Sequence, residues 1–77
     1  MRNENEGEDI LYQTLKLYKK HNIPIHILKK DSRFYNGTIL ELAEDHLILD
    51  DIKLGAMPIY FLEIDVLEKF IKKEVEE

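Results

Sequence analysis

The chain has 77 residues, of which 44% are hydrophobic and 35% charged, and it contains no cysteine. This length and composition fit one small globular domain and exclude both two separate cores and a disordered chain. The lack of cysteine excludes a disulfide framework, a thiolate nucleophile and sulfur-ligated zinc. No apolar run approaches the ~20 residues of a membrane-spanning helix, and the acidic first residues have the wrong charge for a signal peptide. We therefore expect a cytoplasmic protein with no membrane partner.

The charges are segregated along the chain. The formal net charge of -5 at pH 7 argues against broad electrostatic capture of nucleic acid. Residues 10–30, however, contain five lysines and no acid, whereas residues 31–68 contain nine acids and two basic residues. We expect a basic first helix and strand beside an acidic body. Lysines near a helix C-terminus also complement the helix dipole and solvate its outer face, so the basic segment alone does not decide the function.

The N-terminal third of the chain predicts a tail and a helix. Residues 1–8 are polar and acidic, which predicts an unstructured tail. From Asp9, a favourable N-cap residue, apolar residues recur at helical spacing, which predicts an amphipathic helix over residues 9–21. Its apolar stripe consists of Ile10, Leu11, Leu15 and Tyr18. Asn22 and Pro24 are expected to end the helix.

From residue 23 the hydrophobic period changes from 3.6 to 2, which predicts strands. The expected strands span residues 23–28, 34–43, 46–50, 56–62 and 66–70. Gly37, inside the second strand, indicates a sharp bend, because glycine in a strand marks a bulge or a close backbone approach. A bent strand lets a small sheet curl on itself, so residues 23–70 predict a strongly bent, SH3-like β-barrel. Residues 71–77 are predicted to be a polar tail.

The strand residues resemble a known superfamily. Ile23-Pro24-Ile25-His26-Ile27 is similar to the Val-Pro-Val-Ser-Ile segment that follows the N-terminal helix in the Hfq family, the bacterial RNA chaperones of the Sm-like superfamily. Asn36-Gly37-Thr38 is similar to the Arg-Gly-Thr step of archaeal Sm-like proteins, and Asp50-Asp51 to the end of their third strand. Tyr60 and Ile64 fit the spacing of the Tyr-Lys-His-Ala-Ile segment of Hfq.

The resemblance spans about residues 11–68 and implies a small, archaeal-type Sm-like domain over residues 9–70. The implied fold is mainly β, with one N-terminal α-helix on a strongly bent five-stranded antiparallel barrel. It also implies a homo-oligomeric ring of six or seven subunits, in which the fourth strand of one subunit pairs with the fifth strand of the next. Edge pairing is also expected physically, because a chain this small buries only about 60% of its unfolded surface. The predicted interface residues are Met57, Ile59, Phe61, Val66 and Leu67.

The positions of the Hfq uridine pocket have changed. That pocket uses a glutamine on the helix, a Gln-Phe pair after the second strand and the Lys-His of Tyr-Lys-His-Ala. This chain has Leu11, Glu44-Asp45 and Phe61-Leu62 there, so the base contacts are lost and two carboxylates lie where a phosphate would approach. The base pocket of archaeal and eukaryotic Sm proteins is absent too, unless His46 replaces its asparagine. The basic end of the helix is retained at Lys19-Lys20.

Two functions remain open. In the first, a ring binds RNA through helix-end lysines with weak base selectivity, since lysines can bind phosphates without identifying bases. In the second, the ring keeps the fold for structural or protein contacts and has lost RNA binding. The candidate RNA-binding residues are Lys16, Lys19, Lys20, Lys29, Lys30 and His46. No cofactor and no small-molecule substrate is indicated.

Other chemistry-bearing residues favour ordinary structural roles. The aromatic residues can stack on bases, but they are more often core or interface residues. They are Tyr12, Tyr18, Phe34, Tyr35, Tyr60 and Phe61, and only one of the adjacent pair Phe34 and Tyr35 can face the core. No two histidines have metal-ligand spacing. The acidic pairs Glu44-Asp45 and Asp50-Asp51 are expected to be solvated turn residues. Ser32 has no catalytic context and there is no phosphate-binding glycine motif, so we predict that the chain is not an enzyme.

Overall fold

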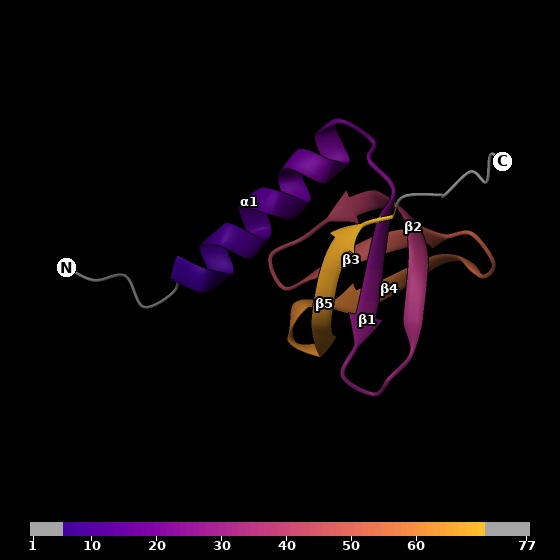
Figure 1. The fold of residues 1–77 in the computed structure, drawn as a ribbon. Helices are drawn as coiled ribbons and strands as arrows, with labels where there is room; N and C mark the ends of the chain where they lie inside the picture. Colours follow the sequence, from indigo (N-terminus) through magenta and orange to yellow (C-terminus); the bar gives the residue numbers. More distant parts are fainter. Residues whose placement is uncertain (1–5, 71–77) are drawn as a thin grey trace, which may run out of the picture.

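The computed structural model describes residues 6–70 of the chain, as one α-helix, five strands and a short 3-10 helix. Figure 1 shows these elements, and no helix among them is long and apolar enough to cross a membrane. Their bounds are α1 (Glu6–Lys20), β1 (Ile25–Lys29), β2 (Phe34–Leu42), β3 (His46–Asp51), β4 (Gly55–Tyr60), η1 (Phe61–Glu63) and β5 (Ile64–Lys69). The predicted tails at residues 1–5 and 71–77 lie outside the described residues.

Helix α1 begins at Glu6, earlier than the predicted start at Asp9, so the prediction of an unstructured tail is wrong for residues 6–8. Acidic residues are favourable in the first turn of a helix because they face the positive end of its dipole, which explains why the acidic segment joins the helix. The helix ends as predicted: Asn22 takes a left-handed φ of 55°, and the Ile23 N–H donates to the Tyr18 carbonyl at 2.9 Å.

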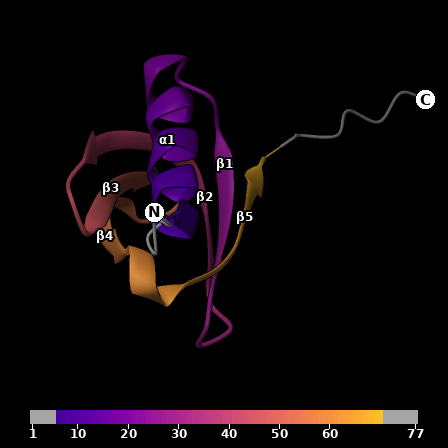
Figure 2. The ribbon, with the colours of Figure 1, turned by 90° about the vertical axis from the view of Figure 1, so that its left-hand side faces the viewer.

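One face of α1 packs against the sheet, chiefly against β2 (Figures 1 and 2). Leu15 is fully buried, and Leu11 and Tyr18 pack against the core at the i, i+4, i+7 spacing of a helix stripe. Ile10, predicted to belong to this stripe, is 62% exposed instead. The helix therefore covers the sheet with a narrower apolar face than its sequence indicated.

The five strands form one antiparallel sheet in the order β4-β3-β2-β1-β5. The sheet is strongly bent, so that β3 and β4 cross over β1 and β5 in Figure 1. Strands β4 and β5 are the two edges, and η1 connects them directly. Pro24 immediately precedes a strand and Pro58 lies in an edge strand, where a missing N–H is tolerated.

Three strand bounds differ from the prediction by two residues, and the others agree to within one residue. Ile23 lies before β1, which begins at Ile25. Phe61 and Leu62 lie in η1 rather than in the fourth strand, because the chain turns there to reach the opposite edge of the sheet. Strand β5 then begins at Ile64 instead of after residue 65.

The core is formed by alternating strand residues and one helix residue. Its buried members are Leu15, Ile25, Ile27, Tyr35, Ile39, Leu47, Leu49 and Ile59. The alternation in β3 is as predicted, with Leu47 and Leu49 fully buried and Ile48 on the other face. Tyr35 is buried while its neighbour Phe34 is 59% exposed, so only one of this pair faces the core, as predicted.

Gly37 lies where two strands approach closely. It pairs with Asp51 of β3, and a Cβ atom at this position would overlap the backbone carbonyl of Asp50. The prediction that a side chain would crowd the curled sheet here is confirmed. The register irregularity of β2 lies further along the strand, between Ile39 and Glu41.

Asp51 contradicts the prediction of a solvated turn acid, because it is only 6% exposed. Its carboxylate accepts hydrogen bonds from the backbone N–H groups of Asn36 (3.0 Å), Lys53 (2.9 Å) and Leu54 (2.9 Å). Burial disfavours the ionised form, but the three N–H donors and the nearby Lys53 charge outweigh it and hold the pKa of Asp51 below its usual range. This carboxylate closes the turn between β3 and β4.

Candidate functional site: the lysine face and the η1 pocket

Three lysines of α1 form one exposed surface, which we call the lysine face. Lys16, Lys19 and Lys20 are all exposed and follow the i, i+3, i+4 spacing that places side chains next to one another. With Gln13 and Leu17 they line a shallow hollow of about 360 Å³. No ion pair joins these lysines to an acid within residues 10–70. The lysine face is therefore a cluster of like charges, which anions such as phosphates would stabilise.

Two of the other predicted RNA-binding residues, Lys29 and His46, do not line the lysine face and already have partners. The Lys29 Nζ atom lies 3.4 Å from a carboxylate oxygen of Glu63 and 5.7 Å from the centre of the Tyr35 ring, with only 14% of its side chain exposed. His46 shares a 2.7 Å hydrogen bond between its Nδ1 atom and Asp45 Oδ1, and its ring lies 5.1 Å from the Tyr60 ring. The predicted set is thus divided into one lysine cluster and separate residues.

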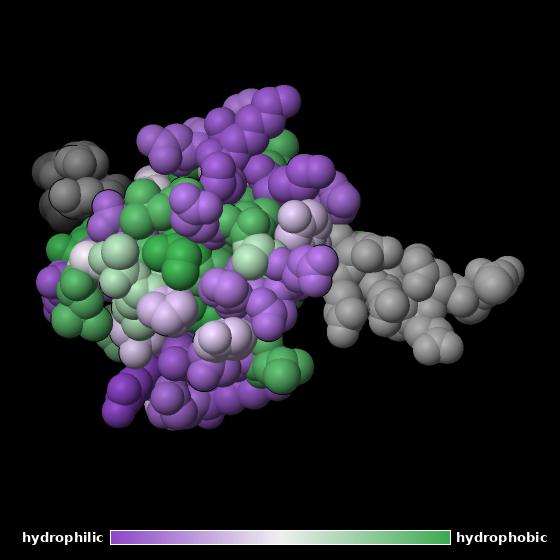
Figure 3. All heavy atoms as spheres, turned by 180° about the vertical axis from the view of Figure 1, so that it is seen from behind, coloured by the Kyte–Doolittle hydropathy of each residue, from purple (hydrophilic) through white to green (hydrophobic). Residues whose placement is uncertain are grey.

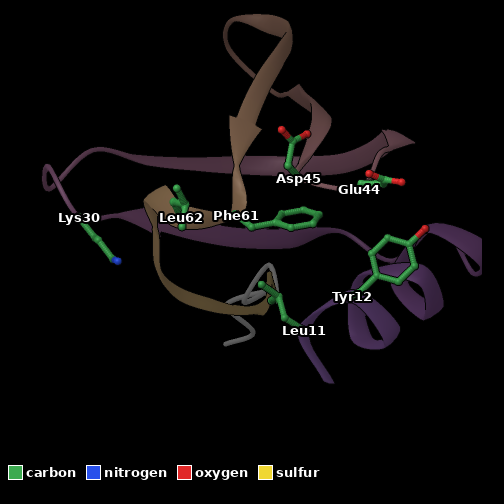
Figure 4. A pocket seen from close by; sticks show the side chains of 7 residues that line it. All are labelled: Leu11, Tyr12, Lys30, Glu44, Asp45, Phe61 and Leu62. Atoms are coloured by element: carbon green, nitrogen blue, oxygen red, sulfur yellow. The ribbon is translucent and has the colours of Figure 1, made fainter. Parts of the chain in front are cut away.

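Lys30 belongs to a second feature, a hollow beside η1 that we call the η1 pocket (Figure 4). This pocket has a volume of about 610 Å³. It is lined by Leu11, Tyr12, Lys30, Glu44, Asp45, Phe61 and Leu62. These include every position at which the resemblance to Hfq indicated a lost uridine contact. The structure therefore brings those positions together, but around an apolar hollow with carboxylates at its edge.

Helix α1, the turn between β2 and β3, and η1 each supply part of the η1 pocket. Figure 4 shows the Phe61 ring in the middle, with Leu11 and Tyr12 on the helix side. The Tyr12 and Phe61 rings meet edge to face, with their centres 6.5 Å apart. The Phe61 N–H donates to the Asp45 carbonyl at 3.0 Å, which fixes η1 against the β2–β3 turn.

The sequence did not predict the η1 pocket as a hollow, because its walls come from four segments far apart in the chain. One signal was present in the sequence. Phe61 and Leu62 are adjacent large apolar residues, and an alternating strand could bury only one of them. In the structure Phe61 packs against the core, while Leu62 is 82% exposed at the pocket edge.

The predicted interface residues lie on or beside the two edge strands in different environments. Ile59 is fully buried, so only its backbone can take part in a contact between subunits. Met57 and Leu67 also pack against the core, whereas Val66 on β5 is 39% exposed. Phe61 belongs to η1 and not to an edge strand. The free backbone groups of β4 and β5 are thus the main features of these edges.

The histidines and carboxylates of the described residues form no group of three or more that could hold a metal ion. The Nδ1 atom of His26 lies 2.6 Å from the side-chain oxygen of Asn36, and its ring lies 5.7 Å from the Phe34 ring. This group lies on the outer side of the sheet, and Glu68 of β5 is opposite His26 in the strand register. We assign it a structural role.

No family model and no curated protein matches the chain. Among solved structures, it is similar to the crystal structure of the pleiotropic translational regulator Hfq, with a TM-score of 0.69. The match covers 75% of this chain and 95% of that one, at 17% sequence identity. The N-terminal helix and the five-stranded antiparallel sheet that the resemblance implied are both present in the structure. The chain therefore has the Sm-like fold, with one N-terminal helix on a bent five-stranded antiparallel sheet.

Proposed function

We propose that the chain assembles into a closed ring of identical subunits, six or seven in number, and that this ring binds RNA through its lysine faces with little base selectivity. The observation that supports the proposal most is the combination of an Hfq-like fold with an exposed lysine cluster on the helix. The role is one of binding and not of catalysis. We expect it to be performed in the cytoplasm.

Ring assembly is supported by the position of the two edge strands. Strands β4 and β5 lie at opposite edges of one sheet, so each subunit offers one edge to a neighbour on either side. Such head-to-tail contacts close into a ring when the rotation between subunits allows it. Pairing would satisfy the backbone donors and acceptors of both edges. It would also cover part of Val66 and Tyr60, which are 39% and 46% exposed.

Phosphate binding is supported by the lysine face. Its three ammonium groups have no acidic partner within residues 10–70, and a ring would repeat them once per subunit. Several weak phosphate contacts on one assembly act together, because the second contact occurs at high effective concentration. Each phosphate that is neutralised releases counterions, so binding of this kind weakens steeply with salt.

Base selectivity is not expected, because the η1 pocket offers few donors. The side chains at the former uridine contacts include Leu11, Phe61 and Leu62, none of which can form a hydrogen bond with a base edge. His46 is already paired with Asp45, which argues against its replacing the asparagine of the archaeal pocket. RNA binding through the lysine face would therefore use contacts to the phosphate backbone, which do not depend on the RNA sequence.

The second candidate function is a ring that serves protein contacts and binds no RNA. The net charge of -5 and the carboxylates of the η1 pocket favour this alternative. It predicts the same assembly, so measurements of ring size do not separate the two functions. Oligonucleotide binding does.

The test is a titration of the purified protein with labelled oligo-U, oligo-A and a mixed sequence at two salt concentrations. We expect similar affinities that fall together as salt increases. A Lys16→Ala, Lys19→Ala, Lys20→Ala variant should bind at least about tenfold more weakly, whereas Lys53→Ala on the β3–β4 turn serves as a matched control with unchanged affinity. Absence of binding at low salt would support the protein-contact alternative. A strong, salt-resistant preference for oligo-U would contradict the proposed lack of base selectivity.

A further inference from the structure

The apolar side chains of the η1 pocket form an exposed hydrophobic surface. Leu62 is the most exposed large hydrophobic residue among those described, at 82%. The Phe61 and Tyr12 rings extend this surface toward Leu11 on the helix (Figure 4). Covering such a surface with an apolar group is favourable, since it removes the surface from water. The pocket is thus suited to a ligand with an apolar part.

The charges around the η1 pocket favour a cation beside that apolar part. Glu44 and Asp45 are both exposed where β2 turns into β3. One oxygen of Asp45 is engaged by His46, and no hydrogen bond or ion pair within residues 10–70 engages its second oxygen or the Glu44 carboxylate. Lys30 is the basic residue that lines the pocket, and Figure 4 shows it at the far end from Glu44 and Tyr12. Lys29 does not add a free charge, because it is paired with Glu63.

These carboxylates also disfavour RNA in the η1 pocket. A phosphate at the Glu44 and Asp45 side of the pocket would meet like charge, and the basic residue that lines the pocket, Lys30, lies at the other end. The lysine face is lined by a separate set of residues and shares none with the η1 pocket. Figure 3 shows that hydrophobic patches elsewhere on the molecule are also bordered by hydrophilic residues, so apolar surface alone does not mark this site. The η1 pocket combines a concave apolar surface with two exposed acids on one side. A second hollow, of about 670 Å³ beside Gly37, also contains two acids, but only Asp50 is exposed there because Asp51 is buried.

We propose that the η1 pocket binds a basic segment of a partner polypeptide, in which an aliphatic or aromatic side chain is flanked by arginine or lysine. The apolar side chain would pack against Phe61 and Leu62, and the flanking cation would pair with Glu44 and Asp45. Arginine suits this position well, because its planar guanidinium can donate to carboxylates while its stem packs on an aromatic ring. The proposal does not depend on RNA binding, since it uses none of the residues of the lysine face.

The test uses three synthetic peptides of equal length and the full-length protein. The first alternates arginine with leucine, the second replaces arginine by glutamate, and the third replaces leucine by serine. We expect the arginine–leucine peptide to bind, and both counterparts to bind at least about tenfold more weakly, because each lacks one of the two contacts. Amide chemical shifts of the labelled protein should change around Tyr12, Asp45 and Leu62.

Variants with matched controls locate the binding. A Glu44→Gln, Asp45→Asn variant should lose about five- to tenfold in affinity for the arginine–leucine peptide, while Glu41→Gln, an exposed acid outside the pocket, should not. Leu62→Ser should also weaken binding, while Leu54→Ser, 67% exposed on the β3–β4 turn, should not. All five positions are at the surface, so the variants are expected to fold.

Three results would overturn the proposal. The first is equal binding of the arginine–serine and arginine–leucine peptides, which would indicate general attraction of cations to an acidic protein. The second is peptide binding that is unchanged by the pocket variants. The third is oligonucleotide binding that shifts the amide signals of the pocket residues. The lysine-face variant described above should leave peptide affinity unchanged, so failure of this proposal and failure of the proposed RNA binding give different results.

Discussion

Gly37 on β2 is paired with Asp51 on β3, and the Asp51 carboxylate accepts a hydrogen bond from the N–H of Asn36, the residue next to that glycine. The two residues depend on one another. The close approach of the strands leaves no space for a side chain at position 37, and it brings the buried carboxylate within reach of the β2 backbone. The close approach of β2 and β3 at this point therefore depends on the absence of a side chain at Gly37 and on the ionised carboxylate of Asp51.

The first prediction concerns the space at Gly37. Gly37→Ala should lower the free energy of unfolding by about 2–4 kcal/mol, because the new Cβ overlaps backbone atoms of β3, which cannot move without disturbing the sheet. Gly55→Ala is the matched control: its φ of 83° is left-handed, but open space surrounds it, so it should cost only about 1–2 kcal/mol. Chemical denaturation measures both. If the Gly37→Ala protein is as stable as the unmodified chain, the backbones of β2 and β3 do not approach each other as closely at this position as described.

The second prediction concerns the ionisation of Asp51. Its pKa is lowered in the folded protein, so its ionised form stabilises the fold above the ordinary aspartate pKa of about 3.9. This stabilisation should be lost as the pH falls below that value toward the lower folded pKa. Asp51→Asn should cost about 1–3 kcal/mol near neutral pH, because the amide NH₂ is brought close to backbone donors.

The Asp51→Asn variant should also show a flatter loss of stability in acid than the unmodified protein. Asp50→Asn, at the exposed neighbouring position, is the control and should change neither quantity. Urea denaturation at a series of pH values checks both expectations. If the free energy of unfolding falls equally steeply with decreasing pH in the unmodified and Asp51→Asn proteins, the result would argue against a buried, hydrogen-bonded carboxylate.

The third prediction concerns the two leucines that lie two residues apart on α1. Leu15→Ala should destabilise the protein by about 2–5 kcal/mol, because it leaves a cavity beneath the helix at a fully buried position. Leu17→Ala, at a position that is 51% exposed, should change stability by less than about 1 kcal/mol. Similar losses for both variants would mean that the helix packs with a different face.

The general fold was predictable from the sequence because the hydrophobic periodicity and the positions of special residues indicate the same elements. The change of period after the helix and Gly37 inside the second strand together favour a small curled sheet, and the structure has one. The start of the helix was missed, since acidic residues without apolar neighbours give no periodic signal. Ile59 was placed at an interface because period-2 alternation identifies two faces without saying which of them is inside.

The candidate site was less predictable, because it depends on contacts between distant segments. Asp51 looked like any acid at the end of a strand, and only the backbone of Asn36 and the following turn show why it is buried. The lysine face was predicted, since its residues are neighbours on one helix. The η1 pocket was not, since Leu11, Asp45 and Phe61 meet only after the sheet bends.

The fourth prediction concerns the edge of β5. Val66→Lys should leave the subunit folded, because position 66 is 39% exposed, but it should disrupt the ring by placing a charge in the contact with the neighbouring β4. Leu54→Lys, on the exposed β3–β4 turn, is the control and should leave the assembly intact. Size-exclusion chromatography with light scattering gives the mass of each. An unchanged assembly in the Val66→Lys variant would place the subunit contact elsewhere.

The most direct test of the account is native mass spectrometry of the purified protein before and after nuclease treatment. The account predicts one closed species of six or seven subunits in both samples, with additional RNA mass that is present before treatment and absent afterwards. A ring without RNA mass in either sample would favour the protein-contact alternative. A monomer at micromolar concentration would contradict the central claim that the free edges of β4 and β5 join subunits into a ring.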